Sequence, residues 1–369
     1  MDSKVEKPAL GEKRDYRNLL ILTIFILLIP LWASPLPGDV LHLDIVNIMV
    51  LAGVYACAVI GLNLLVGYAG QISLGHAAFF GVGAYTTAIL TCHYSWFPTW
   101  LGVLVGAALA GVIGWLVGVP VLRLKGNYLA MATLGLGEIA FILFTQLKGL
   151  TGGTVGIPQG IKVKVGEIPA LSVFGFRFDT DIKFFFLVWA IVMMLMLLNI
   201  NVIRSRVGRG LRALHSSEVA AEAMGVNTAR YKTQVFVLSA VLAGLGGALF
   251  AHFERYISPE SFTFSLSILF ITMVVVGGMG NLWGGVVGVI VLTFLPQVIQ
   301  AMPQWIPGLP SNLTNFSNYT LVLYGILLVI FMMFMPSGIA AGLSRGVYLG
   351  EKQFKRMRDR VRARKYEGH

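Results

Sequence analysis

Polar side chains interrupt a strongly apolar part of the chain between Gly67 and Tyr85. The stretch GYAGQISLGHAAFFGVGAY holds five glycines in nineteen residues and places Gln71, Ser73 and His76 where a lipid-facing helix would carry leucine. Backbone that departs from a regular helix at membrane depth survives only when protein buries it or when it lines a wet cavity. The pattern therefore predicts a broken membrane helix that borders water or a transported substrate.

A second glycine-rich interruption lies in the other half of the chain, in VVVGGMGNLWGGVVG. Paired interruptions are typical of transporters in which broken helices meet between two repeats. Helix packing is the alternative interpretation, because small residues also let helices approach closely. We predict a pathway and packing region made of Asn63, Gly67, Gln71, Ser73, Gly75, Gly81, Tyr85, Glu138, Gly277, Gly278 and Gly280.

One acidic residue falls near the middle of a predicted span. Glu138 lies eleven residues after Asn127, which is about 16 Å along a helix that rises 1.5 Å per residue. A carboxylate at that depth is costly and by default faces the interior of the helix bundle or a polar cavity. Two interpretations stay open: a proton-carrying group, or a structural hydrogen-bond acceptor for a neighbouring helix.

A basic loop between two spans carries the signals of a short helix in SRVGRGLRALHSSEVAAEAMGVN. Ser216 or Ser217 suits the N-cap, Glu218 would stand in the first turn, and Gly225 supplies a stop. A helix of this kind, clear of the hydrocarbon, is suited to dock in a groove on another protein. A helix that lies on the bilayer surface is the alternative.

The predicted docking helix has one small, apolar face. Leu214, Ala221 and Met224 are expected to share that face, and flanking carboxylates are expected to meet basic groups on a partner. The residues assigned to the contact are Ser216, Glu218, Ala221, Glu222, Met224 and Gly225.

Composition places the chain in a membrane. Of 369 residues, 56% are hydrophobic and 12% are charged, which is more apolar surface than a soluble domain needs. We expect an all-α polytopic membrane protein of about ten transmembrane or re-entrant helices with an internal inverted repeat. The third, fifth and eighth spans are weak, so eight or nine helices remain possible. The predicted spans are Leu19–Ser34, Ile45–Val66, Gln71–Thr91, Thr99–Leu122, Asn127–Leu147, Phe184–Val202, Tyr231–Arg255, Phe264–Gly277, Leu282–Ile299 and Thr320–Met335.

The distribution of Lys and Arg predicts which side is cytoplasmic. The tail from Arg345 to His369 holds nine basic and three acidic residues, and the loop from Arg204 to Lys232 holds six and two. Both fall on one side if there are ten spans, and the positive-inside rule makes that side cytoplasmic. The predicted divisions are a cytoplasmic segment 1–18, a permease domain 19–343 and a basic cytoplasmic tail 344–369. Within the domain, 148–183 is an extracytoplasmic loop and 204–230 a cytoplasmic coupling loop. The first span would instead be a cleaved signal peptide on the alternative interpretation.

Two stripes of small residues predict close helix contacts, because residues four apart share a helix face. One comprises Gly102, Gly106, Ala110, Gly114 and Gly118, and the other comprises Ala240, Gly244 and Ala248.

The sequence lacks the motifs expected for ATP binding, metal binding or catalysis. The sequence contains no GxxxxGK[ST] loop for ATP and no HExxH pair, and His76 has no nearby partner ligand. We therefore expect no metal, no cofactor and no enzymatic activity of the chain's own. The net charge of +11 is expected to reflect topology and attraction to anionic lipids rather than nucleic acid.

Five blocks between Gly61 and Gly288 resemble one transporter family. They are GLNLLVGYAGQISLGHAAFFGVGAY, GNYLAMATLGLGEI, LTGGTVGI, RSRVGRGLRALHSSEVAAEAMGVN and ISPESFTFSLSILFITMVVVGGMGNLWGGVVG. Together they resemble the longer permease type of the high-affinity branched-chain amino-acid ABC transporters. The loop fits the general EAA-type motif of importers only loosely, because Val219 occupies the expected glutamate position and Glu218 lies beside it.

The resemblance implies an importer subunit in the bacterial inner (plasma) membrane, with both termini cytoplasmic. It implies a heterodimer with a homologous second permease, two cytoplasmic subunits that bind ATP and Mg²⁺, and a periplasmic or surface substrate-binding protein. The short helix would be the coupling helix to an ATPase. A urea or short-amide permease is the closest alternative, and a proton-coupled secondary carrier is the alternative from another class.

Overall fold

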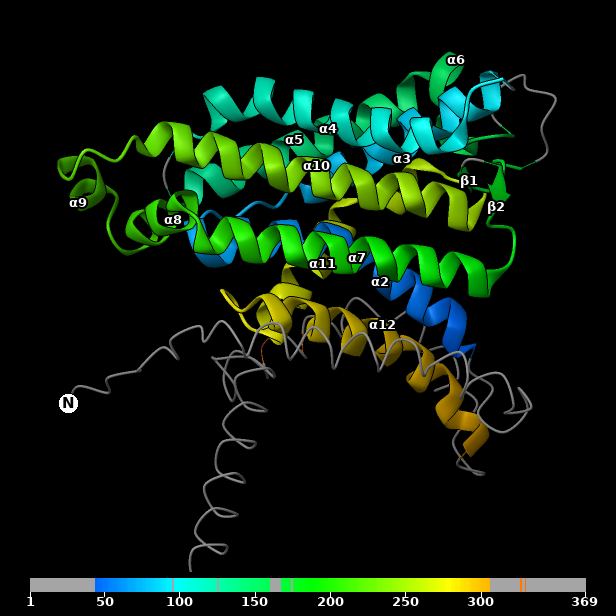
Figure 1. The fold of residues 1–369 in the computed structure, drawn as a ribbon. Helices are drawn as coiled ribbons and strands as arrows, with labels where there is room; N and C mark the ends of the chain where they lie inside the picture. The colour runs from blue at the N-terminus through cyan, green and yellow to red at the C-terminus, as the bar shows by residue number, and fades with distance from the viewer. Residues whose placement is uncertain are drawn as a thin grey trace, which may run out of the picture.

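The protein is a bundle of helices whose axes run roughly alongside one another (Figure 1). The structure, a computed structural model, describes residues 44–305 except 95, 125, 160–166 and 174, together with 326 and 329. The long helices are α2 (Ile45–Asn63), α3 (His76–His93), α4 (Thr99–Val121), α5 (Asn127–Gln146), α7 (Asp181–Arg204), α10 (Thr228–Glu254), α11 (Phe264–Gly277) and α12 (Leu282–Trp305).

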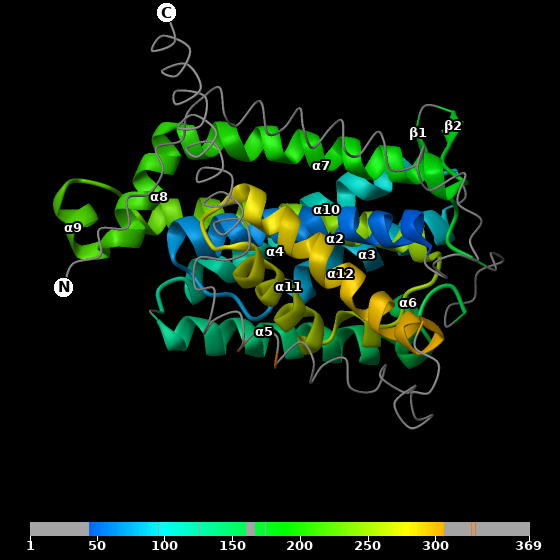
Figure 2. The same cartoon turned by 90° about the horizontal axis from the view of Figure 1, so that it is seen from below.

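Short elements mark the two ends of the bundle. At one end lie α8 (Arg206–Ser216) and α9 (Glu218–Ala223), and at the other lies the antiparallel pair β1 (Ser172–Val173) and β2 (Phe176–Arg177), as both Figure 1 and Figure 2 show. The predicted loops 204–230 and 148–183 therefore lie at opposite ends. The remaining short elements are η1 (Leu64–Tyr68), α6 (Lys148–Thr151), η2 (Gly153–Val155) and η3 (Pro259–Phe262).

The all-α, multi-pass membrane fold is confirmed. Within the described residues, six helical segments are long and apolar enough to cross a membrane, and a shorter apolar helix covers Leu282–Gln297. Each predicted span between residues 45 and 299 corresponds to a helix, although α3 begins at His76 rather than at Gln71. The spans Leu19–Ser34 and Thr320–Met335 lie outside the described residues, apart from 326 and 329. The count of ten and the inverted repeat stay predictions.

Helix α10 is the central helix, and the two predicted stripes explain how its neighbours reach it. It packs against α2, α3 and α4, and 78% of its most apolar window is buried. A Cβ placed on Gly114 of α4 would lie 2.7 Å from the Cβ of Ala240. A Cβ on Gly244 would overlap the side chain of Ala110. The middle of the α4 stripe therefore packs directly on the α10 stripe, whereas Gly102 and Gly106 of the α4 stripe contact α3.

Candidate functional site

The first helix break follows α2. The helix continues into a π-helical turn, Leu64–Tyr68, and Gly70 then takes a φ of +69°, a backbone conformation that glycine adopts without steric cost. Residues 70–75 are not helical, and α3 begins at His76. A Cβ on Gly70 would lie 2.9 Å from Nδ1 of His215 in α8. The break therefore lies directly against the loop at the α8 end of the bundle.

The second break separates α11 from α12 and contacts the first. Gly278 and Gly280 have φ values of +116° and +72°, so the chain turns there and restarts at Leu282. The buried carboxamide of Asn63 joins the two breaks. Its Nδ2 donates to the carbonyl of Asn281 at 2.7 Å, and its Oδ1 accepts from the backbone N–H of Gly280 at 3.0 Å.

Close backbone packing supports the same junction. A Cβ on Gly67 would overlap the backbone nitrogen of Gly280, and one on Gly277 would overlap the carbonyl oxygen of Gly284. The structure thus brings together Asn63, Gly67 and the glycines of the second break, which the sequence placed in one predicted region. Their role in a pathway stays a prediction.

Replacing Asn63 with leucine is expected to weaken this junction. The change leaves the half-buried N–H of Gly280 and the carbonyl of Asn281 without their side-chain partner, and about 1–3 kcal/mol per group is the upper range, which applies to full burial. We expect at least a tenfold loss of substrate uptake at reduced protein yield. Asn63→Gln offers the same groups on a longer stem and serves as the control. Wild-type uptake by a leucine variant of normal abundance would contradict the role given to the junction.

Three buried polar side chains lie within the first break or in α3, which follows it. Gln71, Ser73 and Tyr85 are buried, and the carboxamide of Gln71 and the hydroxyls of Ser73 and Tyr85 make no hydrogen bond in the described structure. Leaving such groups unpaired is unfavourable, and the predicted role of these residues in a pathway stays a prediction. His76 differs, because its Nε2 lies 3.1 Å from the Ser239 hydroxyl of α10.

Gly75 and Gly81 hold this segment against its neighbours. A Cβ on Gly75 would overlap the carbonyl oxygen of Thr133 in α5, and the Leu74 N–H donates to the Thr133 hydroxyl at 3.0 Å. A Cβ on Gly81 would lie 2.7 Å from the ring of Phe144. These contacts show tight packing on α5 at both positions.

The prediction that Glu138 faces the interior of the helix bundle is wrong for the bundle formed by this chain. Its side chain does not face the interior of this chain's bundle but is exposed on α5. Only 22% of the most apolar window of α5 is buried, because this helix lies at one edge of the bundle (Figure 2). The proposed bond to a neighbouring helix of the same chain is therefore not found among the described residues.

The coupling loop folds as two helices rather than one. Ser216 is the last residue of α8 and does not belong to the predicted docking helix, which corrects its assignment. Ser217 is the N-cap of α9, and its hydroxyl accepts from the Ala220 N–H at 3.3 Å. Gly225 follows α9 with a φ of +80°, as its stop signal predicted. The signal for α8 was present in the sequence as apolar residues at helical spacing, Val207, Leu211 and Leu214.

The outward face of α9 differs from the prediction. Ala221 is 3% exposed, whereas Val219 and Met224 are 74% and 84% exposed, so Ala221 and Met224 do not share one face. Sequence reasoning missed Val219 as a surface residue. The predicted outward carboxylates are engaged within the chain. Glu218 pairs with Lys232 at 2.6 Å, and Glu222 accepts from the Thr228 hydroxyl at 2.6 Å.

These contacts connect α9 to the membrane helices. Glu218 and Glu222 hold α9 on the first turns of α10. A Cβ on Gly210 of α8 would lie 3.2 Å from the ring of Tyr231, which also belongs to α10. Because α8 also abuts Gly70, α8 and α9 together contact both α10 and the first break.

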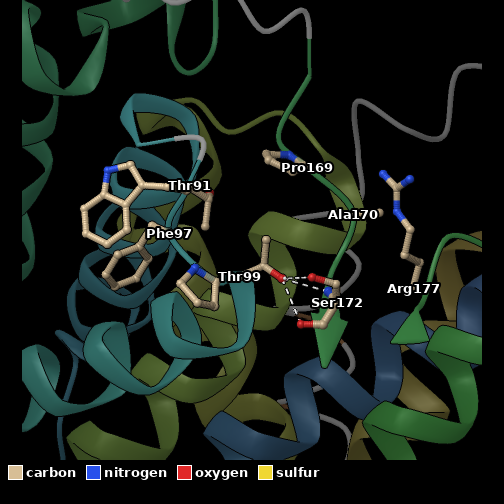
Figure 3. A pocket seen from close by; sticks show the side chains of 9 residues that line it. Thr91, Phe97, Thr99, Pro169, Ala170, Ser172 and Arg177 are labelled. Carbon is tan, nitrogen blue, oxygen red and sulfur yellow. Dashed lines mark hydrogen bonds between the residues drawn. The ribbon is translucent and has the colours of Figure 1, made fainter. Parts of the chain in front are cut away.

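A cavity of about 420 Å³ lies at the opposite end of the bundle. Figure 3 shows Thr99 of α4 beside Ser172 of β1 at its edge, where the Ser172 N–H donates to the Thr99 hydroxyl at 2.7 Å. The cavity is lined by Thr91, Trp96, Phe97, Pro98, Thr99, Pro169, Ala170, Ser172 and Arg177. It is distant from the two breaks and holds none of the predicted site residues.

Comparison with known proteins gives consistent matches. The family described as "Branched-chain amino acid transport system / permease component" matches residues 44–332. The chain is 34% identical over 309 residues to the high-affinity branched-chain amino acid transport system permease protein LivM of Escherichia coli, covering 80% of this chain and 69% of that protein. It is 25% identical over 306 residues to the permease protein LivH of the corresponding Salmonella typhimurium system, covering 79% and 93%. No solved structure gives a significant match.

The family match spans both helix breaks and the α8–α9 loop. The chain therefore belongs to the family of permease components of branched-chain amino acid transport systems.

Proposed function

We propose that this chain is one membrane-spanning permease subunit of an ABC importer that carries branched-chain amino acids such as leucine across the bacterial inner (plasma) membrane. The observation that carries the proposal is the junction of the two helix breaks against α8. A permease of this family needs a region that changes conformation and a contact with the subunits that hydrolyse ATP. The two helix breaks would be that region, and the adjacent α8–α9 loop would be that contact.

The energy would come from two cytoplasmic ATPase subunits, which bind ATP and Mg²⁺ in place of this chain. ATP-driven movement of an ATPase would push α9 through its exposed Val219 and Met224. The ion pair of Glu218 with Lys232 would pass that movement to α10, and α8 would pass it to the break at Gly70. On this proposal the α8–α9 end and both termini are cytoplasmic.

Binding of substrate would begin at the opposite end, from a periplasmic or surface binding protein. The substrate would pass the buried polar groups of Gln71, Ser73 and Tyr85 and the apolar residues beside them. Apolar surroundings suit a branched aliphatic side chain, while a few polar groups suit the ammonium and carboxylate of an amino acid. A homologous second permease would complete the membrane part.

One relative that covers less of the chain is named for another substrate. A nucleoside ABC transporter permease of Lactococcus lactis is 25% identical over 49% of this chain. The relatives that cover most of this chain are named as branched-chain amino acid permeases, so we favour those substrates.

Competition for uptake tests the substrate class. Proteoliposomes would hold the assembled complex, with ATP inside and the binding protein outside, and would be given radiolabelled leucine. We expect unlabelled isoleucine and valine in tenfold excess over leucine to compete strongly, and urea, acetamide and adenosine to have no effect. Uptake of labelled urea or adenosine but not leucine would contradict the proposed substrate.

A further inference from the structure

One helix of the bundle, α5, carries a carboxylate among the apolar side chains that it exposes, which include Ile139 and Leu143. The exposed residues Tyr128, Met131, Glu138, Ile142 and Gln146 recur every three or four positions along α5, with an intermediate step at Gly135, so they form one stripe along the helix. A Cβ on Gly135 would meet nothing within 4 Å. We call this set, with Gly135, the α5 stripe.

The exposed faces of two other outer helices are different. On α4 the exposed side chains within the span are apolar, including Leu104, Leu109, Val112, Leu116 and Val119. On α7, Phe186, Met194 and Leu197 are exposed in the same way. Apolar faces of this kind fit the hydrocarbon of a bilayer. The α5 stripe instead carries a carboxylate eleven residues from the helix start and eight from its end.

The opposite face of α5 is already occupied. Thr133 and Gly137 contact the segment around Gly75, and Phe144 stacks on Tyr85 with ring centroids 4.6 Å apart. The α5 stripe is therefore separated from the first break by the thickness of a single helix.

We propose that the α5 stripe is the surface on which the homologous second permease subunit packs, with a cation or hydrogen-bond donor of that subunit opposite Glu138. The inference rests on the proposed function, which requires such a subunit. A carboxylate near mid-membrane needs a partner of complementary charge or hydrogen bonding, and Glu138 has none among the described residues of its own chain. Gly135 leaves room for a second helix backbone to approach closely.

Site-specific photocrosslinking of the assembled complex tests this assignment. A benzophenone-bearing amino acid would replace Ile142 or Met131 in the α5 stripe and, as matched controls, Leu116 or Val112 in the exposed face of α4. All four side chains are exposed, so the replacements are compatible with the fold of this chain. The two permeases carry different epitope tags, and the complex is irradiated in membrane vesicles without substrate.

We expect an adduct of this chain with the second permease from the α5 positions, at least about tenfold more abundant than from the α4 positions. Equal adducts from both helices would overturn the proposal. So would an adduct between two copies of this chain, or a crosslink from α5 to another segment of the same chain. Because no substrate is present, an adduct with absent leucine uptake would count against the proposed function and not against this interface.

Charge substitutions test the part of the proposal that concerns Glu138. Glu138→Gln keeps a hydrogen-bond acceptor, and we expect the Ile142 adduct to stay within about twofold of wild type. Glu138→Lys places like charge against a donor or cation and is expected to lower the adduct at least about tenfold, at equal abundance of this chain. An unchanged adduct with lysine would overturn the assignment of a donor or cation opposite Glu138.

Discussion

Substrate uptake is expected to be lost when Gly75 is replaced by leucine. The Cβ of any side chain at this position would overlap the carbonyl oxygen of Thr133, and backbone cannot move aside as the end of a flexible side chain can. Overpacking in a close contact costs about 1–3 kcal/mol and more where backbone must shift. We expect the segment from Gly70 to separate from α5 and uptake to fall to background, measured in vesicles with protein abundance determined in parallel.

A control is available at a glycine with open space around it. Gly149 lies in α6, and a Cβ there would meet nothing within 4 Å, so Gly149→Leu is expected to keep uptake near the wild-type value. Gly81→Leu is expected to behave as Gly75→Leu does, because Phe144 and Phe262 occupy the space around it. Normal uptake by an abundant Gly75→Leu protein would show that this close contact is not required.

The ATPase subunits are expected to dissociate when two exposed apolar residues, Val219 of α9 and Met224 directly after it, become acidic. Val219→Asp with Met224→Asp places charge where an apolar groove is expected to receive the helix, and burial of unpaired charge is strongly unfavourable. The two side chains are 74% and 84% exposed, so the fold of this chain should not change. We expect co-purification of the ATPases and uptake to fall at least tenfold.

Controls separate docking from folding in this loop. Ser216→Ala alters an exposed residue of α8 outside the proposed contact. Arg209→Ala removes an exposed charge, and exposed charges contribute little free energy to stability or binding. Both should keep the ATPases. Ala221→Arg is a poorer test, because the buried Ala221 holds α9 in place and its replacement would disrupt the loop itself. Full retention of ATPases and uptake by the double aspartate variant would remove α9 from the coupling contact.

Much of the fold was predictable because membrane helices obey strong local rules. Length and apolarity located the helices, and the four-residue spacing of glycine and alanine identified the faces on which α4 and α10 pack. The break before α3 was also visible, since Gly70 and Gly75 bound a segment rich in polar residues. The partnership of Asn63 with Gly280 and Asn281 was not predictable in detail, because it joins residues more than two hundred positions apart.

The predictions about α9 and Glu138 failed because the same residue type can be buried or exposed. Alanine is compatible with a docking face and with a buried face, so the prediction that Ala221 shares an exposed face with Met224 was wrong. Glu218 and Glu222 were assigned to a partner because their intrachain partners, Lys232 and Thr228, belong to the next helix. For Glu138, counting residues from the start of the helix gave its depth in the membrane. Counting could not show that Glu138 lies on the exposed face of α5, because that depends on how the helices pack together.

The most direct measurement of the central claim is the energy dependence of leucine uptake by the reconstituted complex. Proteoliposomes would receive ATP and Mg²⁺ inside, the binding protein outside and, in separate samples, a proton or sodium gradient without ATP. We predict uptake that requires both ATP and the binding protein and that an ionophore does not reduce. Uptake driven by an ion gradient without ATP, and lost on addition of the ionophore, would contradict the account of this chain as an ABC importer subunit.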